Sequence, residues 1–364
     1  MEKVRRIKLF RIVKKSEISS RESIIIRTTA IILALLVSAV FLAALKLNPF
    51  LVYQGMLKGA FGSTYSIKET IIQAIPLLIT ALGISVAFKM QFWNIGGEGQ
   101  ILIGAFFSSF FAFTFPDMPK IPLLTIMMVA GITGGAIWAF IPAYFKSKWG
   151  TNETIVTLMM NYIAIKWITY LQNGPWKDKT AQGFPKMPLF TDNAILPNFL
   201  GINIGWVIAL ILVVAMYIFM NKTKKGYEIS VLGESEKTAH YAGINIKKTI
   251  IIAMLLSGGL CGIAGMVQAS AVSYTLSVQV SGGVGFTAII VAWLGALSAP
   301  IILVVSILFA ALLEGGAYIQ TAIGTPESTA LILQSMILFF VLGSEFFIRY
   351  KVIRKVSKSI KGEI

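Results

Sequence analysis

The residues best suited to chemistry lie in one short stretch, QFWNIGGEGQ, which occupies residues 91–100 between two strongly apolar runs. It contains three amides, Gln91, Asn94 and Gln100, and one carboxylate, Glu98. A carboxylate at membrane depth is by default a candidate for an ion, proton or substrate site. Unpaired backbone groups are costly in hydrocarbon, so irregular backbone there must be buried in protein or face water. We therefore predict a broken helix that borders a hydrated interior.

The glycines of this stretch, Gly96, Gly97 and Gly99, favour irregular backbone because glycine accepts positive φ without steric cost. Asn94 is expected to cap the following helix by accepting hydrogen bonds from its free N–H groups. Glu98 falls in the first turn, where the positive end of the helix dipole favours a carboxylate. An alternative interpretation is a cytoplasmic loop before a capped helix, and both hold if the helix begins partway into the bilayer.

Other chemistry-bearing residues are sparse. Glu314, in LLEGGAYIQ, is the second candidate for a group that lines a pore. The single cysteine, Cys261, and the single histidine, His240, exclude an intrachain disulfide and argue against a metal site. The chain has no Gly-Lys dipeptide and so no usual phosphate-binding loop. We expect no bound cofactor and no enzymatic activity in this chain.

The composition indicates a membrane protein. Of 364 residues, 56% are hydrophobic and 13% are charged, against about 25% charged residues in soluble domains. Apolar runs near the length that spans a bilayer predict an all-α polytopic fold with about ten membrane helices, within a range of eight to ten. The candidate segments are 28–46, 70–88, 99–115, 121–145, 154–172, 204–220, 247–268, 284–298, 300–317 and 328–348.

The net charge of +16 has a topological interpretation rather than a nucleic-acid one. With a cytoplasmic amino terminus and ten segments, the inner portions hold 24 of the 32 Lys and Arg residues, which is the bias that orients membrane proteins. This predicts both termini in the cytoplasm of a prokaryotic cell, with the chain in the inner membrane. The predicted division is a basic segment at 1–27, one transmembrane domain at 28–348 and a basic tail at 349–364, in contact with lipid headgroups.

Two glycine motifs recur about half a chain apart. GGEG at residues 96–99 and GGVG at residues 282–285 (Gly282, Gly283, Gly285) each precede an apolar run. Five segments separate them, and an odd number inverts the second copy. This spacing is typical of an inverted-topology repeat with glycine-interrupted helices, although glycine also recurs by chance in membrane helices.

The connection at 221–248 contains a predicted short helix in GESEKTAHYAG. Ser235 is a candidate cap, Glu236 lies in the first turn and Gly243 ends the helix. Ala239 and Ala242 would form a small-residue face that a partner surface can approach closely. The alternative is a solvated loop with one helical turn.

Four motifs occur along the chain in this order: FWNIGGEGQILIGA, GTNETIVTLMMNYIA, GPWKDKTAQGFP and KTAHYAGI. In these motifs the sequence resembles permease subunits of bacterial and archaeal ABC importers of the ribose, branched-chain amino acid and nucleoside type. The resemblance implies that the last motif belongs to a coupling helix that docks on a separate ATPase subunit, where ATP-Mg binds. Thr238 stands where alanine is common in the family. The implied coupling residues are Glu234, Glu236, Lys237, Thr238, Ala239, Tyr241, Ala242 and Gly243.

The resemblance is closest to the nucleoside branch. It implies a second permease subunit, identical or homologous, and an external substrate-binding lipoprotein that supplies specificity. The residues expected near the substrate path are Phe92, Trp93, Asn94, Glu98, Gln100 and Glu314. The alternatives are a permease for a ribose-like sugar or a branched-chain amino acid, an ion-coupled secondary transporter that uses the two glycine breaks, and a channel-like scaffold.

Overall fold

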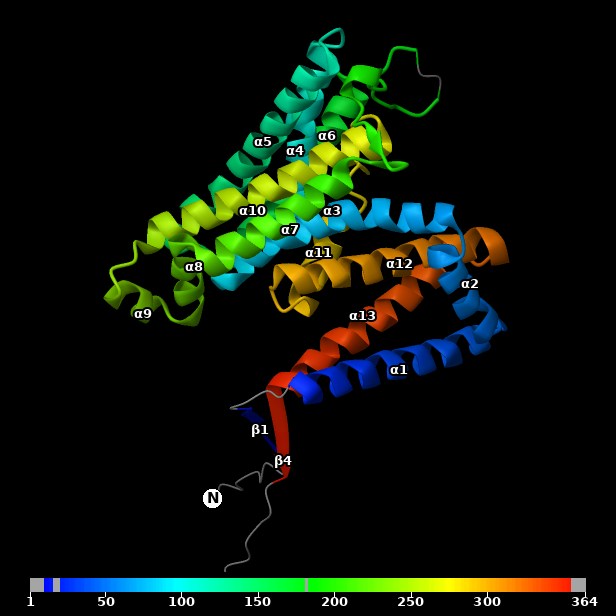
Figure 1. Ribbon diagram of the computed structural model, residues 1–364, viewed down its shortest axis with the longest axis vertical. Helices are drawn as coiled ribbons and strands as arrows, with labels where there is room; N and C mark the ends of the chain where they lie inside the picture. Colours follow the sequence, from blue (N-terminus) through cyan, green and yellow to red (C-terminus); the bar gives the residue numbers. More distant parts are fainter. Residues whose placement is uncertain (1–9, 16–19, 181–182, 355–364) are drawn as a thin grey trace, which may run out of the picture. The chain divides into compact units, whose positions relative to one another are not determined.

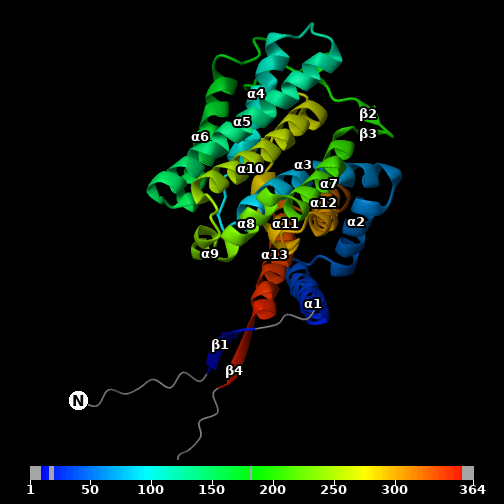
Figure 2. The same ribbon diagram turned by 60° about the vertical axis from the view of Figure 1, so that its left-hand side comes forward.

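The structure is a computed structural model that describes residues 10–15, 20–180 and 183–354. Its contacts divide the chain into two compact units, one formed by residues 1–55 and 319–364 and the other by residues 56–318. The remaining residues of the two predicted basic ends, 1–9, 16–19 and 355–364, lie outside the described residues. Figures 1 and 2 show that helices dominate both units.

The first unit is built on a helix pair. α1 (Ser20–Ala44) packs on α13 (Glu327–Arg349), and the unit also holds the start of α2 (Pro49–Phe61) and the end of α12 (Ala299–Ile323). The buried residues of α1 recur every four positions, at Ala30, Ala34, Ser38 and Leu42. This spacing places them on one helix face. β1 (Phe10–Lys14) pairs antiparallel with β4 (Tyr350–Arg354), with Phe10 opposite Arg354.

The second unit contains the larger helix bundle. Its long helices are α3 (Thr64–Lys89), α4 (Gly97–Thr114), α5 (Lys120–Trp149), α6 (Glu153–Asn173), α7 (Gly205–Lys222) and α10 (Ile246–Gln268). It also holds three shorter helices, α8 (Lys224–Glu234), α9 (Glu236–Tyr241) and α11 (Val284–Leu294), together with the end of α2 and most of α12. α10 packs against α3, α4 and α5 and is the centre of the core (Figures 1 and 2).

Glycines let the helices around α10 approach closely. A Cβ added at Gly104 of α4 would overlap Gly262 of α10, and one added at Gly135 of α5 would overlap the Gly258 carbonyl. Small residues of this kind are typical of packed membrane helices, whose association depends on close van der Waals contact. A side chain at these positions would force the helices apart.

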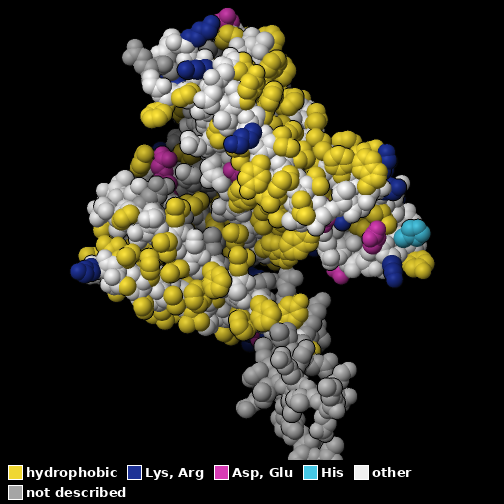
Figure 3. All heavy atoms as spheres, turned by 180° about the vertical axis from the view of Figure 1, so that it is seen from behind, with side chains coloured by type: hydrophobic (Ala, Val, Ile, Leu, Met, Phe, Trp, Pro, Cys, Tyr) yellow, Lys and Arg dark blue, Asp and Glu magenta, His cyan; other side chains and the backbone are white. Residues whose placement is uncertain are grey.

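Eight described helices are long and apolar enough to cross a membrane: α1, α3, α5, α6, α7, α10 with the π-helical turn that follows it, α12 and α13. This confirms the all-α polytopic prediction at the lower end of its range. The two candidates outside this group, 99–115 and 284–298, are the two that follow the glycine motifs. α4 begins with the polar turn Gly97–Gln100, and α11 has only 11 residues. On the face drawn in Figure 3, hydrophobic side chains are widely spread and charged side chains are few.

Two segments differ from the sequence prediction. The 47–69 connection, which lies between two predicted membrane segments, contains the 13-residue helix α2. α1 begins at Ser20, eight residues before the predicted apolar run at 28–46, so the helix extends into the basic segment at 1–27. Both differences have one cause. The search for membrane spans selects long uncharged apolar runs, whereas helices also form over charged residues and over short lengths.

The connection between α6 and α7, in the residues that the structure describes, has short elements of its own. It contains a 3-10 turn, Asp192–Ala194, and a small hairpin, β2 (Asn198–Phe199) with β3 (Ile202–Asn203). Trp176 stacks on Phe106 of α4 with ring centroids 5.2 Å apart, and the Phe190 N–H donates to the Tyr274 carbonyl at 2.8 Å. Tyr274 follows the π-helical turn Ala269–Ser273 at the end of α10.

Candidate functional site

The α3–α4 connection is a series of tight backbone turns. α3 ends at Lys89 and α4 begins at Gly97. Between them the Phe92 N–H donates to the Ala87 carbonyl at 3.1 Å, and the Asn94 N–H donates to the Phe92 carbonyl at 2.9 Å. The helix is therefore broken here, as the sequence predicts, and the backbone satisfies part of its own hydrogen bonding.

The reason for the glycines differs from the prediction. Gln91 has a positive φ of 59°, whereas the φ angles of Gly96, Gly97 and Gly99 are not positive. Space explains Gly99, because an added Cβ would lie 2.9 Å from the Asn161 Oδ1 atom of α6. Close packing around the start of α4, rather than unusual backbone angles, requires the small residue.

A buried amide pair holds the connection together. Asn94 is 0% exposed and Gln100 is 1% exposed. The Asn94 Oδ1 atom accepts from the Gly96 N–H at 3.0 Å and from Gln100 Nε2 at 3.1 Å. The Asn94 amide also donates to Gln100 Oε1 and to the Ser257 Oγ atom of α10, both at 3.2 Å. Asn94 thus closes the turn before α4. The prediction that it caps α4 is wrong, since Gly96 is the N-cap and carries no side chain.

The capping role falls instead to Asn161 of α6. Its Oδ1 atom accepts from the Gly99 N–H, the third N–H of α4, at 2.8 Å, and its amide donates to the Ile95 carbonyl at 2.8 Å. The Thr157 Oγ1 atom, one turn earlier on α6, accepts from the Ile95 N–H at 3.2 Å. Sequence reasoning missed both residues, although they lie in the NETIVTLMMNYIA motif. Their spacing of four residues on one helix face was the available signal.

Glu98 joins the two glycine motifs. Its Oε1 atom accepts from the Gly283 N–H at 3.1 Å, and its Oε2 atom accepts from the Gly285 N–H at 2.8 Å. Gly283 is the N-cap of α11 and has a φ of 77°, and Gly282 before it has a φ of 54°. A Cβ at Gly285 would overlap the Glu98 backbone. The carboxylate, itself 5% exposed, therefore caps α11 from α4, where the helix dipole favours negative charge.

The starts of α4 and α11 consequently meet. A Cβ added at Gly97 would lie 3.5 Å from the Gly285 carbonyl oxygen. The structure brings together the two motifs that the sequence matched over 186 residues. The inverted-repeat relation between the two halves stays a prediction.

Three aromatic rings cluster beside this junction. Phe88 of α3, Trp93 of the connection and Trp293 of α11 have pairwise centroid distances of 5.6–5.7 Å. Trp93 is 47% exposed, while Phe92 next to it is 3% exposed. Among the residues of the 91–100 stretch that were predicted to lie near the substrate path, Trp93 is therefore the one with a large accessible side chain.

The other residues predicted for the path have different surroundings. Phe92, Asn94, Glu98 and Gln100 are buried. Their observed contacts hold the broken helices in place. Glu314 is a partly exposed residue of α12. That these side chains line a substrate path stays a prediction.

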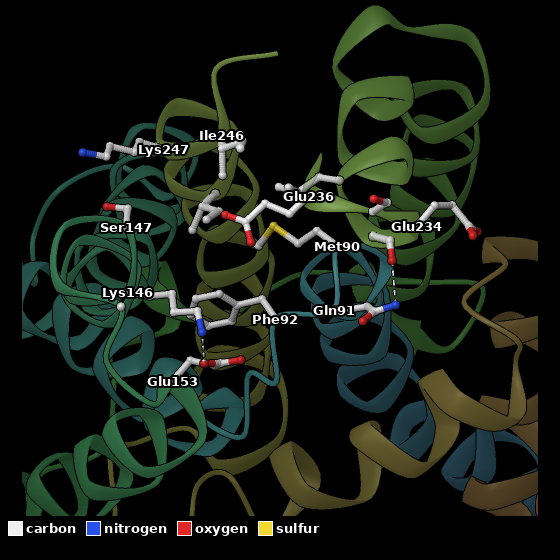
Figure 4. A pocket seen from close by; sticks show the side chains of 15 residues that line it. Met90, Gln91, Phe92, Lys146, Ser147, Glu153, Glu234, Glu236, Ile246 and Lys247 are labelled. Atoms are coloured by element: carbon white, nitrogen blue, oxygen red, sulfur yellow. Dashed lines mark hydrogen bonds and ion pairs between the residues drawn. The ribbon is translucent and has the colours of Figure 1, made fainter. Parts of the chain in front are cut away.

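A groove of about 660 Å³ adjoins the start of the connection (Figure 4). Gln91 Nε2 donates to the Gly233 carbonyl of α8 at 2.6 Å, and Lys146 of α5 forms a 2.8 Å ion pair with Glu153 of α6. A Cβ at Gly233 would overlap the Lys89 carbonyl. α8 is therefore packed directly on the end of α3. The groove is lined by Met90, Gln91, Phe92, Lys146, Ser147, Gly150, Glu153, Leu232, Gly233, Glu234, Ser235, Glu236, Ile246, Lys247 and Ile250.

The short helix in the 221–248 connection is present as α9. Ser235 is its N-cap and accepts from the Thr238 N–H at 3.2 Å, Glu236 lies in its first turn, and Gly243 beyond it has a φ of 71°. The predicted small-residue face is wrong in one respect. Ala239 is 0% exposed and packs within this chain, so Ala242 is the alanine left accessible.

The accessible surface of this segment is instead polar and aromatic. Tyr241 is 91% exposed. The other residues implied for coupling, apart from Ala239, are also exposed: Glu234, Glu236, Lys237, Thr238, Ala242 and Gly243.

A carboxylate of α8, Glu228, joins this helix to α10 through a hydrogen bond. Lys225 Nζ lies 2.5 Å from Glu228 Oε2, and the Thr249 hydroxyl of α10 donates to the same oxygen at 3.4 Å. The hydrogen bond from Lys225 lowers the pKa of the Glu228 carboxyl below its usual value. The carboxylate thus remains charged at neutral pH and can hold both partners.

Comparison with known proteins identifies relatives that span most of the chain. The glucose ABC transporter permease protein TsgB13 of Haloferax volcanii is 32% identical, covering 88% of this chain and 88% of that protein. The nucleoside ABC transporter permease protein NupB of Lactococcus lactis subsp. cremoris is 33% identical and covers 87% and 90%. The guanosine ABC transporter permease protein NupP of Bacillus subtilis is 30% identical and covers 90% and 95%.

The family described as "Branched-chain amino acid transport system / permease component" matches residues 66–342. This range includes the broken α3–α4 connection, α9 and the start of α11, so the match contains the whole candidate site. The chain therefore belongs to this family of ABC transporter permeases.

Proposed function

We propose that this chain forms the translocation path of an ABC importer for nucleosides. A substrate-binding lipoprotein would deliver the solute outside the cell, and a separate ATPase would bind ATP-Mg on the cytoplasmic side. The relatives NupB and NupP, which are nucleoside and guanosine permeases of similar length, support the solute class. A second permease subunit, identical or homologous, would complete the path in a prokaryotic cell membrane, with both termini in the cytoplasm.

One observation carries the coupling mechanism: the exposed α9 segment is tied to the broken helix connection. Gln91 bonds to Gly233 at the end of α8, one residue before Glu234. A movement of α9, driven by the ATPase that docks on it, would shift the turn at residues 89–92. The Asn94–Gln100 pair and Glu98 would pass that shift to the starts of α4 and α11.

The ring cluster of Phe88, Trp93 and Trp293 supports a planar solute. Aromatic side chains favour stacked or edge contacts with other rings, and a nucleobase offers such a face. Stacking of a base on an aromatic side chain contributes about 1–3 kcal/mol. We therefore assign Trp93, the exposed ring, to contact the base during passage.

A sugar is the second candidate, because the glucose permease TsgB13 is as similar to this chain as the nucleoside permeases are. Measuring binding of nucleosides and monosaccharides to the cognate lipoprotein separates the two. Binding of a nucleoside but not of free ribose or glucose supports the proposal. Selective binding of a monosaccharide refutes it.

The transport test uses the full complex in liposomes with ATP inside. We expect uptake of radiolabelled guanosine or adenosine that requires both ATP and the lipoprotein. Replacement of Trp93 by Ala should lower nucleoside uptake about 5-fold or more, which corresponds to the lower end of the stacking energy. Replacement of Tyr162, an exposed residue of α6, by Ala is the matched control. Uptake driven by an ion gradient through this chain alone, without ATP, would instead favour a secondary transporter.

A further inference from the structure

The first unit contains an apolar groove between its two long helices. The groove has a volume of about 720 Å³. One wall is a face of α1 and the other a face of α13, and the first two residues of β4 with the residue after β1 close one end. The lining residues are Lys15, Ile25, Ile26, Thr29, Ala30, Leu33, Phe339, Phe340, Gly343, Ser344, Phe347, Tyr350 and Lys351.

The two walls follow helix periodicity. Residues 25, 29 and 33 of α1 and residues 339, 343 and 347 of α13 recur every four positions. At 1.5 Å of rise per residue, each wall runs for about 12 Å along its helix. Several of these side chains are open to the surroundings: Ile25 is 64% exposed, Phe339 is 73% exposed and Phe347 is 58% exposed. Both helices are long and apolar enough to cross a membrane.

Gly343 provides independent evidence of open space. A Cβ built at this position meets no atom within 4 Å. It differs from Gly104 and Gly135 of the other unit, where helix packing leaves no room for a Cβ. Gly343 therefore widens a groove that the helices of this unit do not fill.

The charged residues lie at one end of the groove. Lys351 follows the first residue of β4 and is exposed, and Lys15 follows the last residue of β1. Lys15 forms a 3.3 Å ion pair with Glu22, whose side chain is 61% exposed. Surface pairs of this kind contribute little, because water screens them and the side chains lose freedom. Tyr350, the first residue of β4, also lines the groove, and its ring stacks on Phe346 with centroids 5.3 Å apart.

We propose that this groove binds one anionic phospholipid. An acyl chain would lie along the α1 and α13 walls, and the phosphate would lie between Lys15 and Lys351, with Glu22 turned toward water. The groove matches such a lipid in charge and polarity. Its apolar walls, about 12 Å long, would contact an acyl chain, and the two lysines at one end would contact the phosphate. Basic pockets between membrane helices are known recognition sites for anionic headgroups.

The test is lipid binding to the purified full-length chain in detergent. Native mass spectrometry would compare dioleoyl phosphatidylglycerol with dioleoyl phosphatidylcholine, which carries the same acyl chains without net charge. We expect preferential retention of the anionic lipid. The double variant Lys15→Gln/Lys351→Gln should weaken its binding about 30-fold, because each lysine near a headgroup contributes roughly fivefold. Replacement of Lys148, an exposed lysine of α5, by Gln is the charge control and should leave binding unchanged.

The apolar part is tested by filling the groove. Gly343→Phe should weaken binding of both lipids, and Thr29→Phe on the opposite wall provides a second variant if the first fails to fold. Leu342→Phe, at a neighbouring exposed position outside the lining, is the volume control. Equal binding of the two lipids to the unaltered chain would overturn the proposal. Unchanged anionic-lipid binding in the double lysine variant, or in a folded groove-filling variant, would overturn it as well. If a groove-filling variant changes the oligomeric state of the chain and still binds the lipid, the groove belongs to a contact with a second copy of the chain instead.

Discussion

Replacement of Glu98 tests whether the two glycine motifs are held together by one carboxylate. Glu98 accepts from the Gly283 N–H at 3.1 Å and from the Gly285 N–H at 2.8 Å, and its side chain is buried. A hydrogen bond to a charged group contributes about 1.5–3 kcal/mol. Glu98→Ala leaves two N–H groups of α11 without this acceptor, so the local cost is about 3 kcal/mol or more.

Glu98→Gln provides a graded variant of the same size. The amide oxygen can accept from one of the two N–H groups, but the amide NH₂ faces the other donor. Its cost should therefore be about half that of the alanine variant, near 1.5 kcal/mol. Glu236→Gln, at an exposed position of α9, is the matched control because it removes a carboxylate that has water around it.

Amide hydrogen exchange at residues 282–286 measures the local opening of α11. Every 1.4 kcal/mol corresponds to a factor of ten, so exchange at Gly283 and Gly285 should accelerate about 10-fold in Glu98→Gln. In Glu98→Ala the increase should reach about 100-fold. The Glu236→Gln control should leave it unchanged. Unaltered exchange at both glycines in a folded Glu98→Ala protein would refute the capping role of this carboxylate.

Three further changes address coupling. Gln91→Ala removes the bond to the Gly233 carbonyl, and we expect ATPase activity of the assembled complex to continue while solute uptake falls several-fold; equal loss of both activities would contradict this. Tyr241→Ala removes a side chain of α9 that is 91% exposed, and the ATPase should co-purify less well with the permease, whereas helix content measured by circular dichroism should not change. The pKa of Glu228 is lowered by Lys225, so the stabilisation from this pair is complete above the usual carboxyl pKa and is lost as pH falls through the lowered value. Thermal unfolding between pH 7 and pH 3 should show a smaller acid-induced loss in Glu228→Gln than in the unaltered chain, and an identical loss would exclude a stabilising role for the pair.

The membrane class and most helices could be predicted from the sequence because they depend on local properties. A run of apolar residues near 20 in length forms a helix in lipid, where every backbone group must find a partner within its own segment. The eight described helices that are long and apolar enough to cross a membrane each overlap one predicted segment. The cap at Ser235 and the end of α9 near Gly243 are equally local, since both depend on residues within one or two turns.

The tertiary structure decided which polar group serves which helix. Asn94 and Asn161 both lie near the start of α4. Asn161, which is 62 residues from Gly99 in the sequence, is the one that caps this helix. Nothing in the local pattern distinguishes them, because a side-chain oxygen from any helix can satisfy an N–H if the packing brings it close. The same holds for Ala239, which sequence spacing assigned to a partner surface and packing buried within the chain.

Glu98 shows where the two levels meet. The sequence by itself determined that a carboxylate in a glycine-rich break lies at a helix start, and it marked residues 282–285 as a second break. Only the tertiary structure decided that the carboxylate belongs to both, because its second role depends on α4 and α11 meeting end to end. Glycine at position 285 permits that approach, and the buried N–H groups of α11 then require an acceptor that their own helix cannot provide.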